Sequence, residues 1–108
     1  MVNSREKGKR AEISLAKELT KYGYECRRGQ QYNGLEGEDV VGLPHIHIEC
    51  KAVERLNLRD AYQQSKDDAK DDQIPVVIHK KNRQPWLVTL NLNDFMMMYR
   101  CWEREWNE

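Results

Sequence analysis

The first part of the chain carries apolar residues at a helical period. Steps of three and four residues separate them: Ala11, Leu15, Leu19 and Tyr22. This spacing is typical of a helix that buries one face. We expect the helix to begin at Ser4, whose hydroxyl can cap it, and to end near Tyr22. Gly23 then takes the position that usually follows a helix C-terminus.

A second helix is predicted from Asn57, as N-cap, to about Asp71. Its expected inward-facing residues are Leu58, Ala61, Tyr62, Ser65 and Ala69. Alternating or continuous apolar runs predict five short strands. They span residues 24–28, 39–41, 46–52, 76–79 and 86–90.

The last helix is predicted to be capped by Asn93 or Asp94. Its first apolar residues are expected to form part of the core and an interface, in preference to a cofactor site: Phe95, Met96, Met97, Met98 and Tyr99. Trp102 and Trp106 lie one turn apart and suit either a dimer surface or packing against a sheet. The full order, α-β-β-β-α-β-β-α, predicts a single α/β domain over residues 1–108, with a mixed β-sheet flanked by helices.

Composition excludes several classes of protein. The chain has 108 residues, of which 39% are apolar and 33% charged, so it is too small for several domains and too patterned for disorder. No apolar run approaches the roughly 18 residues of a membrane-spanning helix. Three cysteines, Cys26, Cys50 and Cys101, form no disulfide framework and favour a reducing cytoplasm, whether bacterial, archaeal or in a phage-infected cell.

Charge is distributed unevenly although the net charge is zero. Residues 1–35 carry eight basic and four acidic side chains, whereas residues 36–72 carry five basic and ten acidic side chains. A basic segment suits a phosphate backbone, and an acidic segment suits a divalent cation. The alternative is a solvated surface with scattered charge.

The segment from Asp39 to Lys51 carries the most informative chemistry. If residues 43–45 form a hairpin loop, Asp39 lies opposite Glu49 on one face of an antiparallel pair. Two such close carboxylates repel unless a cation lies between them. Lys51 is two residues beyond Glu49 and therefore projects from the same face.

This arrangement suits phosphodiester hydrolysis. Asp39, Glu49 and the backbone carbonyl of Cys50 offer the oxygen ligands that Mg²⁺ prefers. A bound Mg²⁺ polarises a phosphate oxygen and acidifies a water molecule. Lys51 could orient that water, help to deprotonate it, or stabilise the charge that develops on phosphorus. The alternative is an exposed strand face with an ordinary salt bridge.

The pattern Asp39-x9-Glu49-x-Lys51 resembles the PD-(D/E)XK nuclease superfamily. That family places an acidic residue on its first helix, where Glu12 lies, and related families place a glutamine on the helix after the lysine, where Gln64 lies. The helix before the hairpin and the helix after it look most like the small Holliday junction resolvases of archaea and phages. The resemblance covers roughly residues 6–95 and implies a restriction-endonuclease-like fold.

The resemblance also implies an activity. A protein of this kind would be a metal-dependent, structure-selective DNA endonuclease that resolves four-way junctions as a homodimer. The resemblance implies Mg²⁺ as its metal ion, with Mn²⁺ as a substitute. Glu12 would be a further metal ligand, and Gln64 would belong to the catalytic site. Glu38 departs from the proline that often precedes the aspartate. Alternatives are a flap, fork or nick nuclease with the same site, a non-catalytic DNA-binding module, and a protein-interaction domain.

DNA contacts are expected from the basic first helix and the glycine-rich loop before Asp39. The candidates are Lys7, Lys9, Arg10, Arg27, Arg28, Gln30, Gln31 and Tyr32. His47 is a further candidate for contact with phosphate. The alternative for the loop is an ordinary surface segment.

Overall fold

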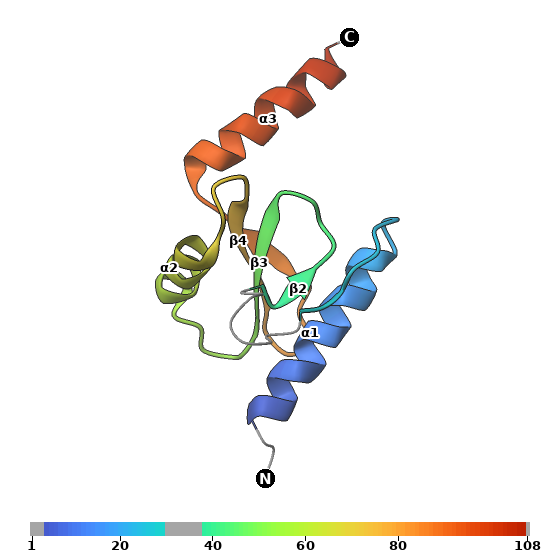
Figure 1. Ribbon diagram of the computed structural model, residues 1–108, viewed down its shortest axis with the longest axis vertical. Helices are drawn as coiled ribbons and strands as arrows, with labels where there is room; N and C mark the ends of the chain where they lie inside the picture. The colour runs from blue at the N-terminus through green and yellow to red at the C-terminus, as the bar shows by residue number, and fades with distance from the viewer. Residues whose placement is uncertain (1–3, 30–37, 108) are drawn as a thin grey trace.

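The computed structural model describes residues 4–29 and 38–107. A sheet lies between α1 and α2, and α3 projects away from both (Figure 1). The elements are α1 (Ser4–Thr20), β1 (Arg27–Arg28), β2 (Val40–Val41), β3 (Ile46–Ala52), α2 (Leu58–Asp68), β4 (Ile74–Lys80), β5 (Leu87–Thr89) and α3 (Leu92–Trp106). This is the predicted order. No helix among the described residues is long and apolar enough to cross a membrane.

The sheet has five strands in the order β1-β2-β3-β4-β5. β3 and β4 run parallel, and every other neighbouring pair is antiparallel. A parallel pair needs a crossover connection, and α2 supplies it between β3 and β4. The sheet is therefore mixed, as predicted.

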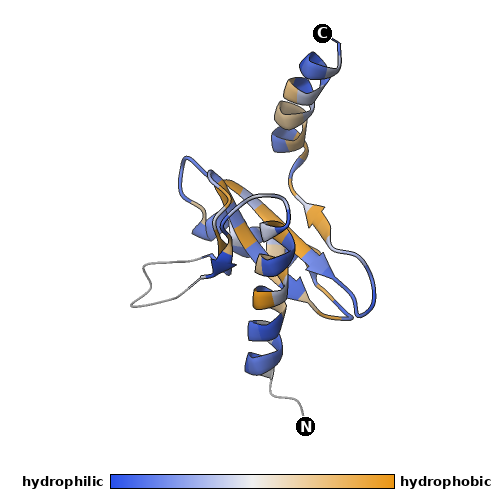
Figure 2. Cartoon of the chain, turned by 90° about the vertical axis from the view of Figure 1, so that its right-hand side faces the viewer, coloured by the Kyte–Doolittle hydropathy of each residue, from blue (hydrophilic) through white to orange (hydrophobic). Residues whose placement is uncertain are grey.

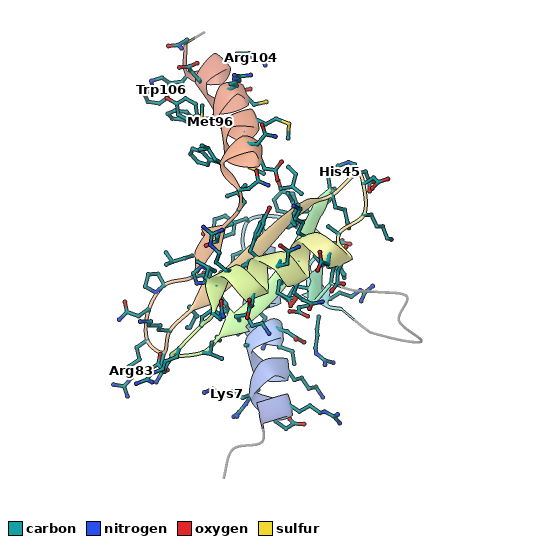
Figure 3. All side chains as sticks on the ribbon, turned by 90° about the vertical axis from the view of Figure 1, so that its left-hand side faces the viewer. Lys7, His45, Arg83, Met96, Arg104 and Trp106 are labelled. Carbon is teal, nitrogen blue, oxygen red and sulfur yellow. The ribbon has the colours of Figure 1, made fainter. Side chains whose placement is uncertain are left out.

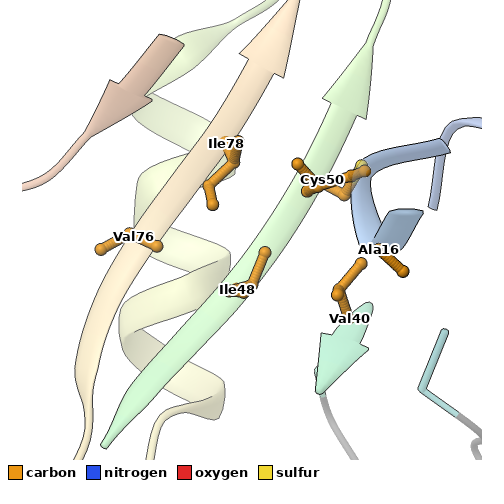
Figure 4. Close-up of a cluster of buried hydrophobic side chains, with 7 residues drawn as sticks. Ala16, Val40, Ile48, Cys50, Val76 and Ile78 are labelled. Atoms are coloured by element: carbon orange, nitrogen blue, oxygen red, sulfur yellow. The ribbon is translucent and has the colours of Figure 1, made fainter. Parts of the chain in front are cut away.

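The core lies between α1 and one face of the sheet. Leu15 and Ala16 of α1 are buried in one cluster with residues of three strands: Val40, Ile48, Cys50, Val76 and Ile78 (Figure 4). Figure 2 shows hydrophobic segments, coloured orange, in the sheet and in the middle of α1. Because side chains alternate along a strand, His47, Glu49 and Lys51 project from the opposite face, which α2 covers.

Ser65 fixes α2 to that second face. Its side chain is fully buried, and the hydroxyl lies 3.0 Å from the Val76 carbonyl and 3.2 Å from the His47 carbonyl. Because this hydroxyl can donate to carbonyl groups of two adjacent strands, it fixes the distance between α2 and the sheet at β3 and β4. The predicted inward positions of Ala61 and Ser65 are confirmed.

Several predicted boundaries shift by a few residues. α1 ends at Thr20, because the next three amide groups make the tighter bonds of a turn that closes at Gly23, with φ 96°. Tyr22 lies beyond the helix and is 73% exposed, so its predicted place in the core is wrong. The predicted strand at 24–28 is reduced to Arg27–Arg28.

α3 differs most from its prediction. Its N-cap is Asn91, whose side-chain oxygen accepts from the Asp94 amide at 2.8 Å, so neither Asn93 nor Asp94 caps it. None of its described residues is buried, and it has no extensive contact with another described element. The expected core position of Phe95 and its neighbours is therefore wrong, because α3 extends beyond the end of the sheet (Figure 1). Trp102 and Trp106 do not pack against the sheet.

Candidate active site

β2 and β3 bring Asp39 and Glu49 together. Val40 pairs with Ile48, which is the register that the hairpin predicted. Asp39 itself lies in a bend just before β2, and its amide donates to the Ile48 carbonyl at 3.0 Å. Its carboxylate oxygen Oδ2 accepts from the Cys50 amide at 2.8 Å. This bond holds the Asp39 side chain over the middle of β3.

The two carboxyl groups are costly to ionise. Glu49 is 6% exposed. Burial and the nearby Asp39 charge raise the pKa of Glu49 to about 7. Burial and the charge of Glu12 raise the pKa of Asp39 to about 6, against the lowering effect of the Cys50 amide. Raised pKa values in two neighbouring carboxyl groups mark a place where positive charge would be stabilised.

Lys51 supplies part of that positive charge. It lies two residues after Glu49 on β3 and is half-buried. Its ammonium group lowers the pKa of both Asp39 and Glu49, although burial has the larger effect on each. The three residues of the predicted motif therefore interact with one another in the folded chain.

Glu12 reaches the same site from α1. Its Oε1 accepts from Nε of Arg28 on β1 at 2.7 Å, so the first helix and the first strand are joined beside the carboxyl pair. The Glu12 charge raises the pKa of Asp39 and of Glu49, whereas the Arg28 charge lowers the pKa of Asp39. Arg28 was expected to contact DNA, and in this structure it contacts Glu12.

Gln64 contacts Asp68, a residue that sequence reasoning missed. Gln64 is exposed on α2, and its Nε2 donates to Oδ2 of Asp68 at 2.6 Å. The Asp68 charge is one of the causes that raise the pKa of Glu49. Asp68 could have been found from its spacing, because it follows Gln64 by one helical turn.

The donor atoms of the site suit a hard divalent cation. Asp39 and Glu49 provide carboxylate oxygens that repel one another without a cation, and Mg²⁺ commonly takes one or two carboxylates and keeps several waters. Within residues 4–29 and 38–107, no group of three or more His, Cys, Asp or Glu side chains is arranged around a common metal position. Asp39 and Glu49, together with a backbone carbonyl and water, could hold such an ion.

Cys50 contributes its backbone to the site. Its amide holds Asp39, and its buried thiol belongs to the core beside α1. Burial and the nearby carboxylates raise the pKa of that thiol to about 12, so it stays protonated in the metal-free chain.

A basic groove lies between α1 and the ends of β3 and β4. Its volume is about 380 Å³, and it is lined by Lys7, Arg10, Ala11, Ala52, Glu54, Lys80 and Asn82. Lys80 was not predicted as a DNA contact, and it stands 5.4 Å from the centre of the Trp86 ring. Lys9 is exposed on α1 but is not part of this lining. Figure 3 shows Lys7 pointing outward near the lower end of α1.

The remaining candidates for DNA contact are placed less favourably for that role. Arg27 is exposed on β1, and its Nη1 donates to the Arg28 carbonyl at 3.2 Å. The predicted contacts at 30–32 lie outside the described residues. His47 is 1% exposed, with Nδ1 3.6 Å from Oε1 of Glu38, so its predicted contact with phosphate is wrong. α2 covers the strand face on which His47 lies.

Comparison with known proteins agrees with this fold. The chain is 26% identical to Hjc, a Holliday junction resolvase from the archaeal hyperthermophile Archaeoglobus fulgidus. Their structures superpose with a TM-score of 0.60, over 78% of this chain and 72% of that chain. No curated protein matches the chain. The mixed sheet and its helices thus have the restriction-endonuclease-like fold that the sequence predicted.

A protein-family model extends the match to nearly the whole sequence. The model described as "Phage putative PDDEXK endonuclease" matches residues 3–105. That range includes the carboxyl pair, Lys51 and both helices that flank the sheet. The chain therefore belongs to the phage PDDEXK endonuclease family.

Proposed function

We propose that this chain is a divalent-metal-dependent DNA endonuclease that cuts four-way junctions. One observation carries the proposal. Asp39 and Glu49 are two neighbouring carboxyl groups whose pKa values are raised to about 6 and about 7, with Lys51 beside them. Two ionised carboxylates this close repel one another, and a bound cation relieves that repulsion. The family to which the chain belongs is one of endonucleases.

The site residues have separate roles in this proposal. Asp39, Glu49 and the Cys50 carbonyl would hold Mg²⁺, or Mn²⁺ in its place. When bound, the ion supplies Lewis-acid polarisation of the scissile phosphate and a more acidic water. Lys51 donates to the oxygen that gains negative charge, so its ammonium group stabilises the transition state more than the ground state. The Cys50 amide keeps Asp39 in place through the reaction.

Two further pairs position this centre. Nε of Arg28 lies 2.7 Å from Oε1 of Glu12 and holds that side chain, and Glu12 could accept a hydrogen bond from a metal-bound water. Gln64 holds Asp68, whose charge acts on Glu49. We propose that both pairs help to position the metal ion and its bound waters.

The proposed substrate is branched DNA. Support comes from the similarity to Hjc, a Holliday junction resolvase. The groove that contains Lys7, Arg10 and Lys80 lies beside the end of β3, where Ala52 lines it, and its basic side chains suit a phosphate backbone. Two strands cut symmetrically need two sites, so the active form is proposed to be a twofold homodimer in the cytoplasm.

A cleavage assay tests the proposal. End-labelled four-way junction, flap, nicked and linear DNA are incubated with Mg²⁺, Mn²⁺ or EDTA. The expected result is paired, symmetric nicks in the junction with metal only. Glu49→Gln should bind the junction and leave it uncut, whereas Glu25→Gln, an exposed carboxylate outside the site, should cut normally. Preference for flaps or forks would refute the junction assignment, and binding without cutting would indicate a DNA-binding module.

A further inference from the structure

The face of α3 that begins at Leu92 is apolar along its whole length. Alternating steps of three and four residues separate its members: Leu92, Phe95, Tyr99, Trp102 and Trp106. This is the spacing of the seam residues by which two helices pair, at positions a and d of a heptad. Arg100 and Arg104 lie outside the seam, and Figure 3 shows Trp106 and Arg104 on opposite sides of the helix.

The aromatic rings of this seam form a continuous row. Centroids are 6.2 Å apart between Phe95 and Tyr99, 5.5 Å between Tyr99 and Trp102, and 5.6 Å between Trp102 and Trp106. The last two rings are stacked at 19°. Contacts within the row leave the side chains exposed, from 38% for Tyr99 to 74% for Trp106. Nothing in the described part of the chain covers them.

The exposed area of this seam matches the area of a stable interface. Aromatic side chains offer about 150–250 Å² each, so the exposed parts of the seam and its flanking methionines amount to about 700 Å². A monomer's largest apolar patch is typically about 300–600 Å². Each partner in a stable dimer contributes about 800 Å². α3 therefore carries more apolar surface than a monomer usually exposes, and close to what one half of a dimer needs.

We propose that α3 pairs with α3 of a second copy of this chain, in antiparallel orientation. The seam grows in size from Leu92 at one end to Trp106 at the other, so antiparallel pairing sets the smallest residue against the largest. A helix of 15 residues is about 22 Å long. Antiparallel pairing then keeps the two nuclease domains at opposite ends, whereas parallel helices about 8–10 Å apart would crowd them together.

This inference rests on the proposed function in one respect: the pairing of α3 would join two active sites. Its physical basis is α3 alone. The dimer that paired incision requires has no other assigned surface, and α3 packs against neither the carboxyl pair nor the basic groove.

The test measures the mass of the full chain by sedimentation equilibrium from 1 to 50 μM. Wild type is expected at twice its 12.9 kDa, and Trp102→Glu at 12.9 kDa. Met97→Glu is the matched control, because Met97 is 52% exposed on the same helix but outside the seam. Circular dichroism and urea unfolding should show each variant folded, since α3 contributes nothing to the core.

The outcomes are separable from those of the cleavage assay. A wild-type monomer at 50 μM, or a Trp102→Glu dimer as stable as the wild type, would overturn the proposal. If the nuclease proposal fails, the masses are unaffected. If only the α3 proposal fails, metal-dependent cleavage persists in Trp102→Glu with unchanged pairing of the two cuts.

Cysteine cross-linking tests the orientation. In a Cys101→Ser background, Tyr99→Cys should form a disulfide-linked dimer, because Tyr99 lies at the middle of α3 and therefore close to the twofold axis. Leu92→Cys should not, because its copy lies at the far end of the paired helices. Efficient Leu92–Leu92 cross-linking would refute the antiparallel arrangement.

Discussion

Replacing Glu49 by glutamine should make the metal-free protein more stable at pH 8. Folding raises the pKa of Glu49 from 4.5 to about 7. At about 1.4 kcal/mol per pKa unit, ionising this group in the folded chain at pH 8 costs about 3 kcal/mol. Water that reaches the carboxylate screens part of the cost, so we expect Glu49→Gln to gain about 2 kcal/mol of unfolding free energy. Glutamine keeps the shape of the side chain and removes its charge.

The sign of the effect depends on pH. A carboxyl group whose pKa is raised on folding binds more protons in the folded chain than in the unfolded chain between the two pKa values. The wild type should therefore lose stability as pH rises from about 4.5 to about 7. Glu49→Gln lacks this loss, so its advantage should be large at pH 8 and small at pH 5.

Urea unfolding in EDTA, followed by circular dichroism at pH 5 and pH 8, measures both quantities. Glu25→Gln removes an exposed carboxylate and should change little at either pH. A Glu49→Gln variant that is less stable than the wild type at pH 8 would refute the reasoning, as would an equal gain at both pH values. Mg²⁺ at pH 8 should then stabilise the wild type and leave Glu49→Gln unchanged.

Three other predictions concern neighbouring residues. Asp39→Asn combined with Glu49→Gln should gain less stability in EDTA than the two single gains added together, because their mutual repulsion is removed only once; a double-mutant cycle measures this. Lys51→Ala should cut at least about 100-fold more slowly in single-turnover assays, while Mg²⁺ still raises its melting temperature. Ser65→Ala should cost about 1–2 kcal/mol in urea unfolding, since two strand carbonyls lose a buried donor; an unchanged midpoint would contradict this.

The motif could be found without coordinates because its chemistry is local. Strand alternation places Glu49 and Lys51 on one face, and a short hairpin then sets Asp39 near them. The observed pairing of Val40 with Ile48 is the one that this reasoning predicts. The bond from the Cys50 amide to Asp39 could not be predicted, because it exists only where the chain leaves regular pairing at the start of β2.

Longer-range relations were less accessible. The pairing of Glu12 with Arg28 joins residues from α1 and β1, and nothing in their spacing specifies it. The burial of His47 depends on α2 lying over the same strand face, which strand alternation alone does not reveal. Asp68 acts on Glu49 only because the crossover returns α2 over β3.

The order of helices and strands, the register of the hairpin and the identity of the carboxyl pair follow from the chain itself, since each depends on residues close in sequence. The surroundings of that pair follow from packing. α1 and α2 cover opposite faces of the sheet, and their positions decide which charges act on Asp39 and Glu49. Packing also decides the environment of α3, because an amphipathic helix looks the same in sequence whether it covers its own sheet or projects into solvent.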